Sequence, residues 1–191
     1  MKYANIKYHD VANGTGIRTS LFVSGCNNNC PGCFNKEAQD FNFGEEFTDD
    51  IIHKILDSVD DDFHDGISIL GGEPLDPKNA PDVLRLVKSF RDKYGYDKSI
   101  WVYTGYIFEN LVEIGNPSVI DILNSIDILV DGPFIESQKS LLLKFRGSRN
   151  QRIILSRESF ITGKLTICEE VMKGERDIHE RRKKWIDKNK S

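Results

Sequence analysis

The chain has 191 residues, of which 39% are hydrophobic and 29% are charged, and its formal net charge at pH 7 is −4. This length suits one domain, and the apolar fraction is enough to build a core, so disorder of most of the chain is not expected. The negative charge argues against nucleic acid as a direct partner. No apolar run is long enough to span a membrane, and the first residues lack the apolar stretch of a signal peptide. We therefore expect a globular protein of the cytoplasm.

Short apolar runs alternate along the chain with segments of helical periodicity. Strands are predicted at residues 20–24, 66–70, 99–103 and 126–130, with a weaker strand at 152–155. Helices are predicted at residues 47–59, 80–94, 108–114 and 119–124, with Thr48 as a candidate N-cap and Pro81 in a first turn. This alternation predicts an α/β fold with a mainly parallel sheet. Four strong strands cannot close an eight-stranded barrel, so a doubly wound sheet and an open αβ barrel both remain.

A glycine-rich or polar cluster follows each of the four main strands. The first strand is followed by a loop with three cysteines, the second by Gly71, Gly72, Glu73 and Pro74, the third by Thr104, and the fourth by Asp131. Ligands of parallel α/β folds bind at the carboxyl edge of the strands. We therefore expect these clusters to form one shared site.

Three of the four cysteines, Cys26, Cys30 and Cys33, lie within eight residues in a Cys-x3-Cys-x2-Cys pattern. Structural zinc usually takes two ligands from each of two separate pairs, and a thioredoxin-type pair would leave Cys26 without a role. A four-iron cluster held by three cysteines would keep one iron open for chemistry, and the spacing favours this interpretation. Cys168 is expected to be a small buried residue or a free thiol. A zinc site that uses Cys168 as its fourth ligand stays an alternative.

These motifs resemble those of the radical S-adenosylmethionine (SAM) superfamily, which combines such a cysteine loop with a Gly-Gly-acid-Pro turn. More narrowly, the chain resembles the activating proteins of the anaerobic ribonucleoside-triphosphate reductase. The similar stretches are residues 13–18 (NGTGIR), 21–35 (LFVSGCNNNCPGCFN), 66–77 (GISILGGEPLDP), 101–106 (WVYTGY), 129–134 (LVDGPF) and 146–152 (RGSRNQR). The chain departs from the pattern at Gly32, where an aromatic residue is common, at Glu73, where aspartate is common, and at Pro133, where lysine is common.

The resemblance implies an incomplete, open αβ barrel of the radical SAM type in residues 1–155, followed by a charged, partly helical extension in residues 156–191. It implies that Cys26, Cys30 and Cys33 ligate a [4Fe–4S] cluster whose fourth iron binds SAM. The residues that it implies around SAM are Gly71, Gly72, Glu73 and Pro74 at the methionine end, Gly32 and Phe34 at the adenine, and Thr104 and Asp131 at the methionine or ribose.

The resemblance also implies an enzyme. One electron, from a donor such as flavodoxin, would cleave SAM, and the resulting 5′-deoxyadenosyl radical would take a hydrogen atom from a glycine of the reductase. The nearest rival is another radical SAM enzyme, such as a pyruvate formate-lyase activating enzyme or a 7-carboxy-7-deazaguanine synthase. A different class of function would be a non-catalytic iron–sulfur protein or a zinc-binding module.

Overall fold

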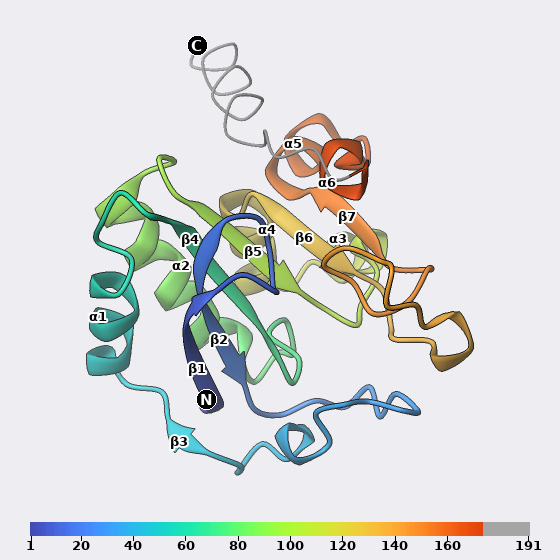
Figure 1. Cartoon of the computed structure of the whole chain (residues 1–191), viewed down its shortest axis with the longest axis horizontal. Coiled ribbons are helices and arrows are strands. Elements are labelled where there is room, and N and C mark those ends of the chain that lie inside the picture. The colour runs from blue at the N-terminus through green and yellow to red at the C-terminus, as the bar shows by residue number, and fades with distance from the viewer. Residues whose placement is uncertain (174–191) are drawn as a thin grey trace.

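A computed structural model describes residues 1–173; the rest of the predicted C-terminal extension, including its basic run at residues 181–184, lies outside the described residues. Within residues 1–173, seven strands form one sheet in the order β3-β1-β2-β4-β5-β6-β7 (Figure 1). The strands are β1 (Lys2–Asp10), β2 (Ile17–Val23), β3 (Glu45–Glu46), β4 (His64–Gly71), β5 (Ser99–Tyr103), β6 (Ile128–Asp131) and β7 (Arg152–Leu155). The helices are α1 (Asp49–Asp57), α2 (Ala80–Tyr94), α3 (Phe108–Ile114), α4 (Pro117–Ser125), α5 (Ser156–Thr162) and α6 (Glu169–Lys173), with short 3₁₀ turns η1 (Glu37–Gln39) and η2 (Glu136–Gln138).

The middle of the sheet is parallel and its outer strands are antiparallel. Strands β2, β4, β5 and β6 pair in parallel, whereas β1 and β7 pair antiparallel with β2 and β6. The predicted α/β architecture with an open sheet is therefore confirmed, but the sheet is parallel only in its middle, since three of its six strand pairs are antiparallel. The arrangement is consistent with an open barrel.

Most predicted elements are found, and α2, β5 and β7 have the predicted bounds. Strand β6 begins at Ile128 rather than at residue 126, because the N–H of Ile126 still donates to Ile122 O and ends α4. Thr48 occupies the N-cap position of α1, but its side chain makes no capping hydrogen bond. The sequence pattern does not predict β1, since only two of its nine residues are buried and the strand is held to β2 by backbone hydrogen bonds.

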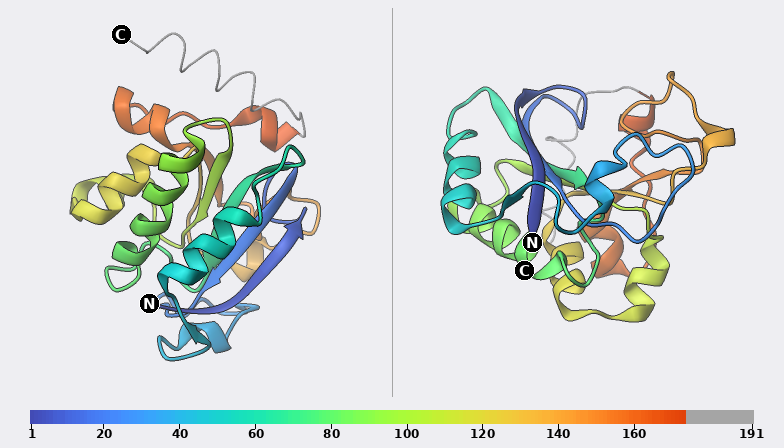
Figure 2. Two further views of the ribbon diagram at one scale, coloured as in Figure 1. Left: turned by 90° about the vertical axis from the view of Figure 1, so that its left-hand side faces the viewer. Right: turned by 90° about the horizontal axis from the view of Figure 1, so that it is seen from below.

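The larger core lies between the sheet and the helices that cover one of its faces (Figure 2). Side chains alternate between the two faces of each strand. The strand residues that face the helices include Leu21, Ile67, Ile69, Val102 and Leu129, and they pack against Val83, Leu86, Phe90 and Ile122. This core fixes the strands, and hence the positions of the loops at their carboxyl ends.

A smaller core covers part of the opposite face, which we call the inner face. Trp101, Ile128, Val130 and Ile153 project there and pack with Cys168 and Val171, which come from the segment around α6. Cys168 is 1% exposed, which confirms the expectation that it is a small buried residue.

One outer edge of the sheet is covered, and the other is covered only at its start. Strand β3 consists of two exposed glutamates that pair with the start of β1. Beyond β7, Leu155 donates its N–H to Thr166 O, Cys168 donates to Ile153 O, and a single bridge joins Ile154 to Ile167.

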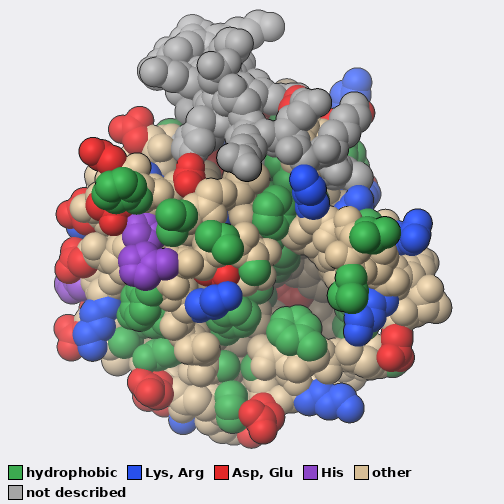
Figure 3. Space-filling model, in the orientation of Figure 1, with side chains coloured by type: hydrophobic (Ala, Val, Ile, Leu, Met, Phe, Trp, Pro, Cys, Tyr) green, Lys and Arg blue, Asp and Glu red, His purple; other side chains and the backbone are tan. Residues whose placement is uncertain are grey.

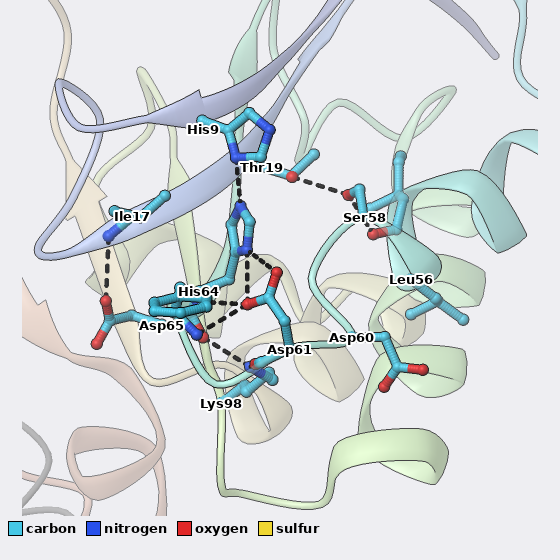
Figure 4. Close-up of polar contacts among 12 residues, drawn as sticks. His9, Ile17, Thr19, Leu56, Ser58, Asp60, Asp61, His64, Asp65 and Lys98 are labelled. Atoms are coloured by element: carbon cyan, nitrogen blue, oxygen red, sulfur yellow. Dashed lines mark hydrogen bonds and ion pairs between the residues drawn. The ribbon is translucent and has the colours of Figure 1, made fainter.

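The amino edge of the parallel strands is tied by a polar network (Figure 4). His9 Nδ1 and His64 Nε2 are 3.0 Å apart, and His64 Nδ1 lies 2.8 Å from a carboxylate oxygen of Asp61. Lys98 Nζ donates to the backbone carbonyls of Asp61 and His64. Each of these side chains has a hydrogen-bond partner within the network, which holds this edge of the sheet together.

None of the helices within residues 1–173 combines the length and the apolar character that a membrane span requires.

Candidate functional site

A cavity of about 460 Å³ opens on the inner face at the carboxyl ends of the parallel strands. Of the predicted site residues, those that line it are Cys26, Cys30, Cys33, Gly32, Phe34, Gly71, Gly72, Glu73 and Thr104. The space-filling view shows a hollow on this face, with hydrophobic and basic side chains gathered beside it (Figure 3). Segments that are far apart in the sequence therefore meet at one place, as the edge argument predicts.

Two predicted residues lie outside the cavity wall. Pro74 is buried behind the turn that carries Glu73. The buried carboxylate of Asp131 accepts hydrogen bonds from Arg152 Nε at 2.9 Å and from the backbone N–H of Phe108 at 2.9 Å. Asp131 thus holds α3 and β7 in place beside the cavity, while its neighbour Gly132 lines it.

The cysteine loop, residues 24–36, leaves the end of β2 and is held by backbone hydrogen bonds. Gly25 and Cys26 donate their N–H groups to Ala38 O and Gln39 O at 2.8 and 3.0 Å. The N–H of Cys33 donates to Cys30 O at 3.1 Å, which closes a tight turn. These bonds keep the three half-buried thiols on the cavity side of the loop.

Gly72 allows the turn after β4 to approach the cysteine loop closely. A Cβ atom on Gly72 would lie 2.5 Å from Gly25 O and 2.9 Å from Ala38 O, both of them backbone atoms. The two segments are also joined directly, because the N–H of Glu73 donates to Gly25 O at 2.8 Å. The requirement for glycine here therefore comes from contact between two parts of the chain.

Glu73 is fully buried and joins three loops of the site. Its carboxylate accepts hydrogen bonds from Thr104 Oγ1 at 2.7 Å, Gly105 N at 2.7 Å, Asn28 Nδ2 at 3.0 Å and Leu75 N at 3.0 Å. Burial raises the pKa of Glu73 to about 7, against the opposing effect of these hydrogen bonds. The hydroxyl of Thr104 is thus committed to Glu73, and the cysteine loop is fixed to the carboxylate through Asn28.

The thiol of Cys26 has a raised pKa, because burial disfavours the thiolate and the charges of Glu73, Cys30 and Cys33 add to that effect. A thiolate at this position therefore calls for a positively charged ligand, which a metal centre supplies. Within residues 1–173, no three His, Cys, Asp or Glu side chains are arranged to hold a single metal ion. In a cubane cluster each cysteine binds a different iron, so its thiolates are spaced around a larger object. The donor set fits a multi-iron cluster better than a single ion.

The cavity also offers unused polar groups. Among the described residues, the Tyr103 hydroxyl and Arg146 Nε are buried and have no hydrogen-bond partner. Both residues line the cavity, and burial raises the pKa of Tyr103 and lowers that of Arg146. Buried polar groups without partners indicate that a polar ligand fits this space.

Sequence reasoning did not single out several cavity residues, among them Asn13, Tyr103 and Phe145. A signal for Asn13 is present in the sequence, since Asp10 precedes it by three residues. The short side chain of an aspartate often accepts hydrogen bonds from groups a few residues away in the chain. Asp10 indeed accepts hydrogen bonds from Asn13 Nδ2 at 2.6 Å and Ser20 Oγ at 2.6 Å. For Phe145, the long loop after η2 gives no such local signal.

Comparison with known proteins identifies a family and close relatives of this chain. Residues 12–154 match the family model described as "4Fe-4S single cluster domain". The match places the chain among proteins that hold one [4Fe–4S] cluster.

The anaerobic ribonucleoside-triphosphate reductase-activating protein of Salmonella typhi is 41% identical over 153 residues, which covers 79% of this chain and 96% of the relative. The protein of the same name from Escherichia coli K12 is 40% identical with the same coverage, and that from Enterobacteria phage T4 is 32% identical over 155 residues, or 80% and 93% of the two chains. No solved structure gives a significant match. The chain belongs to the family of anaerobic ribonucleoside-triphosphate reductase-activating proteins, which confirms the family indicated by its motifs.

Proposed function

We propose that this chain is a radical SAM enzyme of open-barrel type that installs a glycyl radical on an anaerobic ribonucleoside-triphosphate reductase. The observation that carries the proposal is that three cysteines share one cavity with the Gly71–Gly72–Glu73 turn, while the fourth cysteine, Cys168, belongs to the inner core. A three-cysteine set supports a cluster with one iron free for a ligand. The names of the relatives support the reductase as the partner.

In this proposal, Cys26, Cys30 and Cys33 hold a [4Fe–4S] cluster, and SAM occupies the rest of the cavity. When bound there, the cluster and SAM would supply 5′-deoxyadenosyl radical chemistry, with an electron from a donor such as flavodoxin. The protein's own task is then to bind, orient and shield.

Several residues of the chain suit that task. The backbone of Gly71 and Gly72 forms the cavity wall at the methionine end of SAM, and carbonyls of this turn would accept from its ammonium group. Glu73, whose carboxylate is hydrogen-bonded within the protein, would hold the turn in place. Gly32 and Phe34, which line the same cavity, would contact the adenine. The Tyr103 hydroxyl and Arg146 Nε have unused donors for polar groups of the ligand.

The remaining predicted residues have supporting roles in this proposal. Thr104 orients Glu73 by its hydrogen bond of 2.7 Å. Pro74 shapes the turn behind Glu73, and Asp131 fixes the wall next to Gly132 through Arg152. None of these three needs to touch SAM for the site to keep its shape.

The test is anaerobic reconstitution of the chain with iron and sulfide. We expect about four irons per chain, formation of 5′-deoxyadenosine from SAM with a strong reductant, and a glycyl radical signal when the reductase is added. Cys26→Ala should abolish all three, whereas Cys168→Ala should retain them. Binding of zinc in place of iron, or a failure to form 5′-deoxyadenosine, would refute the proposed radical SAM activity. Cleavage of SAM without a radical on the reductase would instead favour a different radical SAM activity.

A further inference from the structure

The segment of residues 139–149, which we call the rim loop, follows η2 and runs beside the mouth of the cavity (Figure 1). Two successive leucines at its tip are almost fully exposed, Leu141 at 93% and Leu142 at 92%. Leu141 lines the cavity. Exposed apolar side chains that adjoin one another beside a cavity are typical of interaction sites.

The exposure of these leucines is not due to a loose loop. Lys139 and Ser148 form an antiparallel bridge at its base, and Gln151 Oε1 accepts the N–H groups of Gly147 and Ser148. Phe145 packs edge-on against Trp101 of the inner face, with ring centroids 5.4 Å apart. The loop therefore buries one of its apolar residues and presents the leucines to solvent from a fixed base.

The segment that leads into the rim loop lies against the cysteine loop. A Cβ atom on Gly32, whose φ is +72°, would lie 2.8 Å from the carboxyl group of Glu136, just before the rim loop. The two loops run side by side in Figure 1 and again in the right-hand view of Figure 2. Phe34, which is 86% exposed, lines the same cavity as Leu141. An object that covers the leucines would therefore also cover the mouth of the cavity.

The charge of the rim loop indicates what kind of object fits it. Lys139, Lys144 and Arg149 are exposed, and Arg146 is partly buried, so the loop carries four bases and no acid in a chain of net charge −4. The complementary surface is therefore acidic with an apolar depression. Residues 174–191 of this chain hold seven Lys and Arg against four Asp and Glu. Because residues 174–191 and the rim loop both carry a net positive charge, that segment is not expected to bind to the loop.

We propose that the rim loop is the docking element that holds the protein substrate, through an acidic surface of that partner with an apolar depression for Leu141 and Leu142. This inference rests on the proposed function, since it is the substrate polypeptide that must reach the cavity. The leucines would supply most of the affinity, because burying them removes apolar surface from water, and the bases would speed the encounter.

The test measures binding of the reconstituted full-length chain to the purified anaerobic ribonucleoside-triphosphate reductase of the same organism. Leu142→Ser and Lys144→Glu change exposed side chains that do not line the cavity. We expect Leu142→Ser to weaken binding about tenfold, and Lys144→Glu to slow association and reduce its dependence on salt. The matched control is Phe63→Ser, which removes a side chain that is 78% exposed near the amino edge of β4.

SAM cleavage in the absence of the reductase separates the two proposals. Wild type and all three variants should form 5′-deoxyadenosine equally, with weaker binding in the two rim-loop variants alone. If wild type cleaves SAM and the rim-loop variants bind the reductase as wild type does, the docking role is wrong. If these variants change only the self-association of the chain in sedimentation, a second copy is the occupant and the proposal is also wrong. If wild type does not cleave SAM, the proposed function itself fails.

Discussion

Replacing Gly72 by alanine tests whether close contact between two turns builds the site. The new Cβ would lie 2.5 Å from Gly25 O, well inside the 3.0 Å below which such contacts essentially never occur. The neighbours are backbone atoms, so the clash cannot be relieved by rotation of a side chain. The backbone of Gly72 is not in the left-handed region, so alanine suffers from lack of space alone.

The expected cost follows from the contacts that must shift. Overpacking in a tightly packed region costs about 1–3 kcal/mol. Moving Gly25 also weakens the hydrogen bonds from Glu73 N to Gly25 O and from Gly25 N to Ala38 O, each 2.8 Å long, at about 1 kcal/mol each. We expect the free energy of unfolding to fall by about 3–5 kcal/mol.

The assay is urea unfolding of the apoprotein, paired with an iron count after reconstitution. Gly163→Ala is the matched control, because Gly163 has φ +64° and no atom within 4 Å of an added Cβ. It should cost about 1 kcal/mol from backbone strain and leave the iron content unchanged. A Gly72→Ala protein as stable as wild type with full iron content would show that the close approach is not needed, and would refute the reasoning.

Three further predictions concern buried groups elsewhere. Cys168→Ala should cost about 1 kcal/mol of unfolding free energy because it lies in the small inner core, yet leave the iron content unchanged, whereas Cys26→Ala should lose the iron. Burial alone would raise the pKa of Asp10, but hydrogen bonds to its carboxylate outweigh that effect and lower the pKa to about 2. Its stabilisation is therefore complete above about pH 4 and lost as the pH falls towards 2, and Asp10→Asn should remove about 2 kcal/mol of that pH dependence in unfolding measured by circular dichroism. Arg18→Leu should cost about 3 kcal/mol or more in the same measurement, since the buried guanidinium donates to Ser68 Oγ and to the carbonyls of Ile67 and Ser99, which would lose their donor.

The elements with strong local signals could be predicted from the sequence. Helix α2 is predicted by its apolar spacing and by Pro81 in its first turn, and in the structure it ends at Gly95, whose φ is +53°. The three clustered cysteines and the Gly71–Gly72 turn could be assigned to one edge because parallel strands place their carboxyl ends together.

The features that could not be predicted from the sequence depend on contacts between distant parts of the chain. No periodicity indicates that Glu73 is bonded to Asn28 and Thr104, or that the residue touching Gly72 is Gly25. One contact that holds the rim loop beside the cavity is the packing of Phe145 on Trp101, a pair that lies 44 positions apart in the sequence. Strand β1 escaped for a different reason, since its stability comes from backbone pairing that leaves little mark on side-chain type.

The two outer edges of the sheet determine whether other chains can bind this protein by strand addition. An exposed edge strand is a template on which a second chain can add a strand, which leads to fibres as readily as to complexes. Here β7 is covered by the segment around Ile167, whereas β3 covers only the start of β1 with Glu45 and Glu46 and leaves the outer side of β1 from Ala4 to Asp10 without a paired strand. Among residues 1–173, the outer side of β1 is thus the open edge of the sheet. The exposed charge of Lys7 and the positive φ of His9 (54°) disfavour addition of a strand there, which leaves recognition to side chains around the cavity.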